Sequence, residues 1–390
     1  MLIIICNTSF RIFRKNITII KFIYVRYKSM KLSDYRDPAL TNAIAEKIKD
    51  LTSTAHVKFC HICGTHEYAV THYGLRTLLP RNLEVIAGPG CPVCVVPARD
   101  IDEAVWLALN GVTVATFGDM LRVPGSDMSL ADAKAKGGDV RVVYGVDEAV
   151  KMALKYPEKS FVFFAVGFET TVPANAAEIL SGPPKNLSFL VSHRLIPPAM
   201  ELLLGVGDLK IDGFICPGHV ATVIGVKAFR MFPEVYSMPT VIAGFEPVDV
   251  MISLYMLMKQ LKENSARVDN EYTRSVTEEG NVKAQKIIEE VFEVDGGNWR
   301  GIGRVPSSAY KLKGEYANYD ARVIYDIKVG PAKDIQPGCS CHLVIIGKIK
   351  PNECTMFMKT CTPENPYGPC MVSHEGTCRI WAEHGEYQTL

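Results

Sequence analysis

The chain has 390 residues, of which 48% are hydrophobic, and a formal net charge of +1. This length exceeds one compact core and predicts two or three domains, while the balanced charge argues against nucleic acid as a partner. The twelve cysteines form two groups, with only Cys6 and Cys216 outside them. Secreted disulfide scaffolds are short and loop-rich, so these thiols favour a reducing, cytoplasmic location.

The first 29 residues contain six Lys or Arg and no Asp or Glu. Their apolar runs are too short and too interrupted by charge to span a membrane, and we expect no membrane association. A basic segment without acids fits a transit peptide, but a start upstream of the true one, with Met30 as the first residue, is the preferred interpretation. We therefore leave residues 1–29 out of the fold and expect residues 30–55 to form a helix that packs with the C-terminal domain.

Strand-like and helix-like segments then alternate, which predicts an α/β fold with buried parallel strands. The strand-like runs form two sets of four, at 56–60, 83–87, 112–117 and 140–144, then at 161–166, 187–191, 211–216 and 239–243. Similar Gly-x-x-Glu turns follow the first strand of each set. The pattern predicts two similar parallel-sheet α/β domains, residues 56–158 and 159–264, that face each other across a cleft.

Four cysteines lie in two loops that each follow a strand-like run: Cys60 and Cys63 in the first, Cys91 and Cys94 in the second. Loops at the carboxyl ends of parallel strands share one edge of a sheet, so Cys63 is expected to face the Cys91–Cys94 pair. Thiolate is the form that binds metal, so the surroundings are expected to lower the cysteine pKa, and the helix N-terminus after Cys91 is expected to stabilise the anion. The cluster predicts redox or metal chemistry.

Residues 265–390 are predicted to form a C-terminal domain rich in Pro, Gly and Cys. Disulfides fit poorly with a reducing compartment, and the spacing resembles no zinc finger, although zinc stays possible. An iron–sulfur cluster needs four thiolates and tolerates irregular spacing. The cysteines available to it lie at positions 339, 341, 354, 361, 370 and 378.

Several separate motifs resemble the HypD family of [NiFe]-hydrogenase maturation proteins, from Met30 to about Trp381. They are DYRDP (34–38), CGTH (63–66), GPGCPVC (88–94), GFETT (167–171), PGHV (217–220), CTPENP (361–366) and GPCMVS (368–373). The resemblance implies two α/β domains and a third domain with a [4Fe–4S] cluster. It also implies a role in assembling the Fe(CN)2CO group of the hydrogenase, together with a small HypC-type chaperone and a HypE-type cyanide donor.

The resemblance assigns roles to individual residues. Cys63 is implied as an iron ligand shared with the small partner, and Cys91 and Cys94 as the redox-active pair. The cluster ligands that we select are Cys341, Cys354, Cys361 and Cys370, with Cys339 and Cys378 as competing thiols. The sequence departs from the family pattern in the 29-residue extension, in Glu67, where threonine is common, and in Cys60, which forms a second C-x-x-C with Cys63.

Three further side chains are candidates for the same site: His66, Glu169 and His219. His66 is a candidate proton donor or partner of a metal ligand, whereas Glu169 and His219, with His193, are expected on the facing half of the cleft. The leading hypothesis is a redox-active assembly scaffold rather than a stand-alone metabolic enzyme, in which a cluster and the Cys91–Cys94 dithiol relay electrons while Cys63 holds iron. The alternatives are a stand-alone thiol-disulfide oxidoreductase and a zinc-stapled structural protein.

Overall fold

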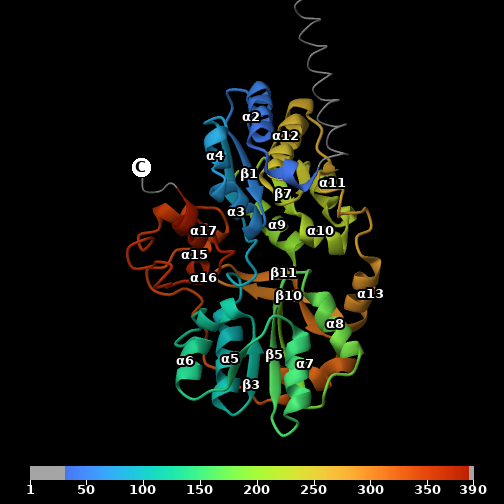
Figure 1. The fold of residues 1–390 in the computed structure, drawn as a ribbon, viewed down its shortest axis with the longest axis vertical. Helices are drawn as coiled ribbons and strands as arrows, with labels where there is room; N and C mark the ends of the chain where they lie inside the picture. The colour runs from blue at the N-terminus through green and yellow to red at the C-terminus, as the bar shows by residue number, and fades with distance from the viewer. Residues whose placement is uncertain (1–30, 386–390) are drawn as a thin grey trace, which may run out of the picture.

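Two parallel β-sheets carry the fold of the computed structural model, which describes residues 31–385 (Figure 1). The first sheet has the strand order β2-β1-β7-β8-β9 and the second has the order β4-β3-β5-β6, with every neighbouring pair parallel. The predicted α/β class with parallel sheets is confirmed. The predicted extension, residues 1–29, lies outside the described residues.

The first sheet contains β1 (Val57–His61), β2 (Leu83–Ala87), β7 (Gly213–Pro217), β8 (Thr240–Ala243) and β9 (Val268–Asn270). The second sheet contains β3 (Thr113–Thr116), β4 (Val140–Val142), β5 (Phe161–Gly167) and β6 (Leu187–His193). All seven residues of β5 and of β6 are buried, because helices cover both faces of this sheet, as their continuous apolar runs predict.

The strands are grouped differently from the prediction of two consecutive units. After β2 the chain leaves the first sheet, builds the whole second sheet, and returns with β7 beside β1. The predicted ranges 56–158 and 159–264 therefore each contain strands of both sheets, and this grouping was wrong. Parallel strands resemble one another in sequence, and no local signal says which sheet a strand joins.

Helices cover both faces of the first sheet. One buried cluster of side chains joins this sheet to α2 (Pro38–Leu51), α3 (Gly64–His72), α4 (Leu75–Leu78) and α12 (Pro247–Glu263). The opposite face packs against α9 (Ile196–Leu204), α10 (Gly218–Ile224), η3 (Val226–Phe229) and α11 (Met231–Tyr236).

The second sheet is covered in the same way. Its first face packs against α5 (Ala98–Leu109) and α6 (Leu130–Ala135), and the other against α7 (Val146–Lys155), α8 (Val172–Leu180) and α13 (Val282–Val291).

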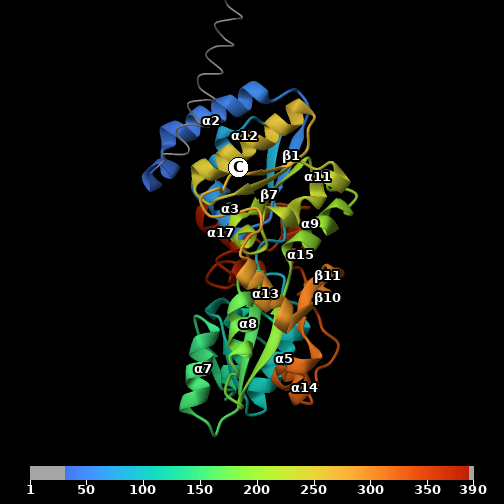
Figure 2. The ribbon, with the colours of Figure 1, turned by 90° about the vertical axis from the view of Figure 1, so that its right-hand side faces the viewer.

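Helix α2 does not pack with the C-terminal segment, so that prediction was wrong. Asp37 caps the helix by accepting hydrogen bonds from the backbone N–H groups of Ala39 and Leu40. Ile44 and Ile48 lie on one face of it and are buried with residues of α12 and the first sheet. Figure 2 shows α2 lying across α12 at the end of the molecule. The apolar stripe is real, but its partner could not be identified from the stripe alone.

The chain after β9 runs back along both sheets. The hairpin of β10 (Phe292–Trp299) and β11 (Gly303–Leu312) lies between them, and the short helices α15 to α17 flank the junction (Figure 1). The remaining short elements are η1 (Leu32–Arg36), η2 (Gly118–Arg122), η4 (Gly314–Tyr319), α14 (Ala321–Ile324), α15 (Cys341–Ile345), η5 (Pro351–Glu353), α16 (Pro369–Val372) and α17 (Thr377–His384).

The predicted boundary at residue 265 does not match the sheet, because β9 lies beyond it and pairs with β8. Side chains of the C-terminal cysteine segment are buried in the same cluster as the loop after β2, so the two share one core. Among the described helices, none has the length and apolar character that a membrane crossing requires.

Candidate thiol site

Cys63 follows β1 and is the N-terminal cap of α3. Only 3% of its surface is exposed. Burial raises the pKa of the Cys63 thiol to about 12, although the nearby backbone N–H groups of His66 and Thr65 oppose this rise. The lowered cysteine pKa that the sequence predicts is therefore not found at Cys63, where burial outweighs the N–H groups. The metal-free side chain is a thiol at neutral pH, with N–H groups placed to stabilise a thiolate once it forms.

Cys91 and Cys94 form a disulfide in the loop after β2, with their Cα atoms 5.3 Å apart. Cys94 is fully buried and Cys91 is 7% exposed. The backbone N–H of Cys94 donates to Cys91 Sγ over 3.1 Å. The pair predicted to be redox-active is thus present in its oxidised form and is shielded from solvent.

The loops of Cys63 and Cys91 touch through Gly90. Gly64 N donates to Gly90 O over 3.3 Å, and a Cβ atom on Gly90 would overlap the backbone N and Cα of Cys63. Only glycine allows this approach. As a result, Cys63, Cys91 and Cys94 line one small cavity, which Cys370 and Glu375 close from the C-terminal segment.

Cys60 takes no part in this cavity. It is fully buried in β1, where its sulfur lies against Gly88 and near Cys216 on the neighbouring strand β7. Burial raises the pKa of both thiols. Cys60 and Cys63 are both free thiols. The second C-x-x-C is therefore not a bonded pair, because its two side chains lie in different surroundings.

A larger hollow of about 660 Å³ opens beside the small cavity. Residues that follow the carboxyl ends of strands in both sheets line it, including Thr65, Phe117, Thr170 and His219. His374 and its neighbours line the same hollow from the C-terminal segment. The strand ends of both sheets thus meet the thiol loops at one place.

His66 and His219 both contact the ring of Phe245, His66 in a stacked arrangement and His219 in a tilted one. Phe245 lies with its centroid 5.0 Å from each imidazole. His66 Nε2 lies 2.9 Å from Gly244 O, and burial lowers the His66 pKa to about 3. Burial also lowers the pKa of His219, to about 4. Both rings are therefore neutral at physiological pH, and of the two only His219 lines the hollow.

Glu169 does not face the hollow, in contrast to the prediction. Its carboxyl accepts a hydrogen bond from the backbone N–H of Ile196, at the start of α9, while Oε2 has no partner. Burial raises the Glu169 pKa to about 7. His193 is buried as well, with Nε2 2.8 Å from the Asn175 amide nitrogen. The next residue of the motif, Thr170, lines the hollow instead, because Glu169 turns into the core.

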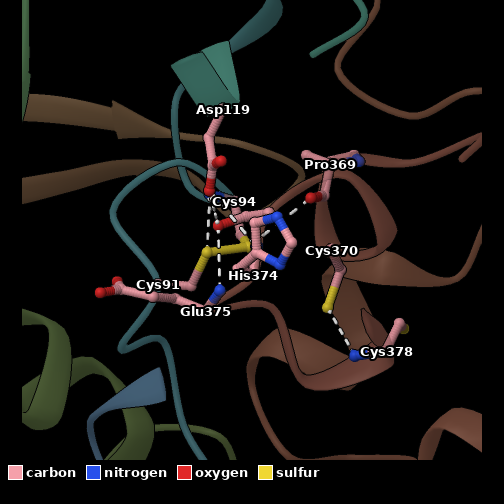
Figure 3. Close-up of a disulfide and its surroundings, with 9 residues drawn as sticks. Cys91, Cys94, Asp119, Pro369, Cys370, His374, Glu375 and Cys378 are labelled. Carbon is pink, nitrogen blue, oxygen red and sulfur yellow. Dashed lines mark hydrogen bonds between the residues drawn. A yellow bond between two sulfur atoms is a disulfide. The ribbon is translucent and has the colours of Figure 1, made fainter. Parts of the chain in front are cut away.

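The C-terminal cysteines gather beside the disulfide. Figure 3 shows the disulfide between Asp119 and the segment that carries Pro369 and Cys370, and Cys94 Sγ lies 3.8 Å from Pro369 O. The thiols of Cys341 and Cys378 donate toward Cys370 and lower its pKa to about 5, and the backbone N–H of Cys378 lies 3.2 Å from its sulfur. Three thiols are therefore in contact at this point.

Two more cysteines border this group and one is held on a neighbouring loop. Cys339 contacts Cys341, and Cys361 lies close enough to both for their charges to influence its pKa. A short loop connects Cys354 to Cys361. In this loop the backbone N–H of Phe357 donates to Cys354 O, and Phe357 forms an isolated β-bridge with Cys361. Of the four predicted cluster ligands, the structure brings Cys341, Cys361 and Cys370 together and leaves Cys354 on that loop.

Two side chains that the sequence did not assign connect the thiol regions. Glu67 is fully buried and accepts hydrogen bonds from Arg76 and from Trp381 in α17, and its Oε2 lies 2.7 Å from His61. Asp119, after β3, accepts from the Ser373 hydroxyl over 2.9 Å. Glu67 stood out only as a departure from a family pattern, and its partner Trp381 lies too far along the chain to be predicted.

In this parallel α/β frame, a buried free thiol, a disulfide and one cysteine of the C-terminal group line one cavity, an arrangement typical of proteins that use thiols in redox chemistry or metal binding. Comparison with known proteins identifies the family. The sequence model described as HypD, hydrogenase formation hypA family, matches residues 39–385.

Relatives of the chain extend over most of its length. A putative hydrogenase expression/formation protein of Methanocaldococcus jannaschii is 47% identical over 88% of this chain and 94% of its own length. The hydrogenase maturation factors HypD2 of Bradyrhizobium diazoefficiens and HypD of Cupriavidus necator are 42% and 41% identical, each over 92% of this chain and 98% of the relative. The chain belongs to the HypD family of hydrogenase maturation factors, as its motifs predicted.

Proposed function

We propose that the chain is the scaffold on which the Fe(CN)2CO group of [NiFe]-hydrogenase is assembled, with the iron bound as substrate through Cys63. The observation that carries this proposal is the single cavity lined by Cys63, Cys91, Cys94 and Cys370. Low-spin iron with cyanide and CO is soft and electron-rich, and thiolates are suited to it. A free thiol beside a disulfide supplies both a ligand and a redox group.

The Cys63 side chain is expected to change from a thiol to a thiolate when it binds iron. Burial keeps its thiol protonated, so iron binding must release a proton. The backbone N–H groups of Thr65 and His66 lower the thiol pKa and so favour the thiolate that binds iron. His66 contributes through its backbone, while its ring is held by Gly244 and Phe245. We therefore assign His66 a positioning role.

The donor set of the C-terminal segment fits a [4Fe–4S] cluster. Within residues 31–385 no three His, Cys, Asp or Glu side chains are arranged to hold a single metal ion. In a four-iron cluster, however, each thiolate binds a different iron, so the sulfurs need not converge on one point. A Cβ atom on Gly368 would lie 2.5 Å from Cys341 Sγ and 2.7 Å from Cys339 Sγ, so glycine at this position lets both sulfurs approach the backbone.

We propose Cys341, Cys354, Cys361 and Cys370 as the cluster ligands. Backbone N–H groups already point at two of these sulfurs, since Tyr367 N lies 3.4 Å from Cys361 Sγ and Cys378 N lies 3.2 Å from Cys370 Sγ. Such hydrogen bonds stabilise thiolates and tune a cluster. Cys339 and Cys378 compete with Cys354 for the fourth position, and single Cys→Ser variants assayed for iron decide between them.

The Cys91–Cys94 disulfide takes up two electrons and two protons when it is reduced to two thiols. A cluster, when bound, supplies single electrons. Cys94 Sγ lies against Pro369, the residue before Cys370, which supports electron exchange between the C-terminal segment and the disulfide. The dithiol and the Cys63 thiol then face the same cavity, so the redox state of Cys91 and Cys94 is expected to affect how Cys63 binds iron.

The hollow beside the cavity is proposed as the docking and delivery region for partners. Its volume of about 660 Å³ is in the range of ligand sites, and it opens next to Cys63 through Thr65. A HypC-type chaperone would share the iron with Cys63, and a HypE-type protein would deliver cyanide here. The neutral His219 lines this path and can hold or donate one proton at its ring nitrogen. A cytoplasmic location is part of the proposal, because every described cysteine except Cys91 and Cys94 is a free thiol.

A stand-alone thiol-disulfide oxidoreductase is the second candidate, and the formed disulfide favours it. Its burial argues against it, because Cys94 is fully buried and Cys91 only 7% exposed, so a general disulfide substrate cannot reach either sulfur. Reduction of a small generic disulfide by the isolated chain, at rates of a dedicated oxidoreductase, would support this candidate. A zinc-stapled protein is separated from both by metal analysis.

The Cys63→Ala variant tests the proposal. The complex with the small partner, isolated without air, is expected to lose iron together with its infrared cyanide and CO bands, while the C-terminal cluster is retained. The matched control is Cys60→Ala, which removes a buried thiol three residues away that lies outside the cavity. Retained cyanide and CO bands in Cys63→Ala would remove the assigned role.

A further inference from the structure

Arg300 is a buried cation in the turn between β10 and β11. It is 2% exposed, and among the described residues it is one of the largest side chains that are fully buried. Its guanidinium donates to the carbonyl oxygens of Asp334 over 2.9 Å, Pro124 over 2.6 Å and Val96 over 3.4 Å. Three separate segments are thus held by one side chain.

The same residue is bonded to the disulfide loop. Arg300 N donates to Val95 O over 3.0 Å, and its side chain reaches Val96 O, so it contacts the two residues directly after Cys94. On its other side Arg300 lines a small cavity together with Cys339 and Cys341. Arg300 is therefore the side chain that lies between the disulfide loop and the first cysteines of the C-terminal group.

Asp334, Cys339 and Cys341 lie close enough to Arg300 to interact with its positive charge. Burial lowers the Arg300 pKa, and Asp334, followed by Cys341 and Cys339, raises it. Asp334 is itself engaged, since its carboxylate accepts from Ala98 N over 2.8 Å and from Gly301 N over 3.2 Å. Arginine stays protonated in proteins, so a full positive charge persists beside the two cysteines in a region of low dielectric constant.

We propose that Arg300 is a positioning residue that fixes the disulfide loop against the C-terminal cysteines and raises the reduction potential of the cluster bound there. A cluster held by thiolates becomes more negative when it accepts an electron, and a nearby fixed cation stabilises that reduced form. This inference rests on the proposed function, because it requires the cluster. Its positioning half concerns the disulfide loop alone.

The charge half is tested by potentiometric titration of the loaded protein, followed by EPR. At the wild-type midpoint, Arg300→Gln is expected to shift the ratio of oxidised to reduced cluster about tenfold toward the oxidised form, which is 59 mV for one electron. Arg300→Lys keeps the charge and is expected to restore most of this shift. Arg304→Gln is the control, since Arg304 is an exposed residue of the same hairpin and pairs with Asp295. A loaded Arg300→Gln protein with the wild-type potential overturns the charge role.

The positioning half is tested on cluster-free protein by the rate at which a phosphine reduces the Cys91–Cys94 disulfide. Arg300→Lys loses the planar fork that holds three carbonyls, so at least a threefold faster reduction is expected, with Arg304→Gln at the wild-type rate. An unchanged rate in Arg300→Lys overturns this half, even where Arg300→Gln does not fold. Wild-type protein that never binds iron would contradict the proposed function instead, and the phosphine measurement would still decide the positioning role.

Discussion

Cys63, Cys91 and Cys94 lie in loops at the carboxyl ends of β1 and β2, whereas the cysteines from Cys339 to Cys378 lie on the short helices α15 to α17 and the loops around them. In the first region the sheet fixes where the loops meet, so the thiols are placed by backbone pairing alone. In the second region the thiols contact one another and the first region. One site is therefore preorganised by the fold, and the other is organised by its own sulfurs and by the segments on which it packs.

Two of the polar contacts of the second region fix it to helices that follow strands of the two sheets. Trp381 Nε1 donates to Glu67 over 2.6 Å, and the Ser373 hydroxyl donates to Asp119 over 2.9 Å. Both acceptors belong to segments that directly follow the strands of a sheet. Substitutions at these contacts are expected to separate the two regions, and substitutions inside each region are expected to affect that region alone.

Glu67→Gln is expected to have the largest effect. The amide removes the charge that pairs with Arg76 and loses an acceptor for the surrounding donors, so about 3–5 kcal/mol of unfolding free energy is expected to be lost. Urea unfolding measures the loss, and limited proteolysis is expected to cut the C-terminal segment first. Glu46→Gln, on the exposed face of α2, is the control and is expected to change stability by less than about 0.5 kcal/mol. Equal effects of the two substitutions would mean that Glu67 does not connect the regions.

Gly90→Ala tests the preorganised region. The new Cβ would meet backbone atoms of Cys63, which cannot rotate away, so a loss of about 3 kcal/mol and displacement of Cys63 from the cavity are expected. Urea unfolding and the rate of Cys63 alkylation measure both. Gly207→Ala, at a glycine with no atom within 4 Å of the added carbon, is expected to leave both unchanged. A Gly90→Ala protein of wild-type stability would contradict the interlocking of the two loops.

Glu169→Gln probes a buried carboxyl outside both cysteine regions. Because burial raises the Glu169 pKa from its ordinary 4.5 to about 7, its favourable contribution is complete below pH 4.5 and is lost as the pH rises through 7. The wild type is therefore expected to lose on the order of 2–3 kcal/mol between pH 5 and pH 8.5 relative to the variant. Unfolding free energies of both proteins at these two pH values give the difference. Parallel pH profiles would show that Glu169 is not a buried acid, and iron loading should be the same in both proteins.

Much of the frame and of the first cysteine region could be predicted from the sequence. Continuous apolar runs such as Phe161–Gly167 predict buried parallel strands, and loops after such strands must share an edge, which places Cys63 near Cys91. These inferences use only local pattern and a geometric rule. They hold because neither depends on which distant segment completes the structure.

The remainder depends on distant partners that leave no local trace. The pairing of β1 with β7, the packing of α2 on α12 and the inward turn of Glu169 are each decided by elements far away in sequence. The same is true of the C-terminal cysteines, whose irregular spacing predicts a cluster but does not say which thiols meet. Burial of Cys63 likewise raises its pKa, whereas a lowered pKa was predicted for the metal-binding cysteines.

Metal and sulfide analysis of protein purified without air, with EPR of the reduced sample, tests the central claim most directly. The account predicts about four irons and four acid-labile sulfides per chain. It also predicts that Cys361→Ser loses this cluster while Cys63→Ala retains it. A colourless protein that contains zinc, or a cluster that disappears in Cys63→Ala and persists in Cys361→Ser, would contradict the account.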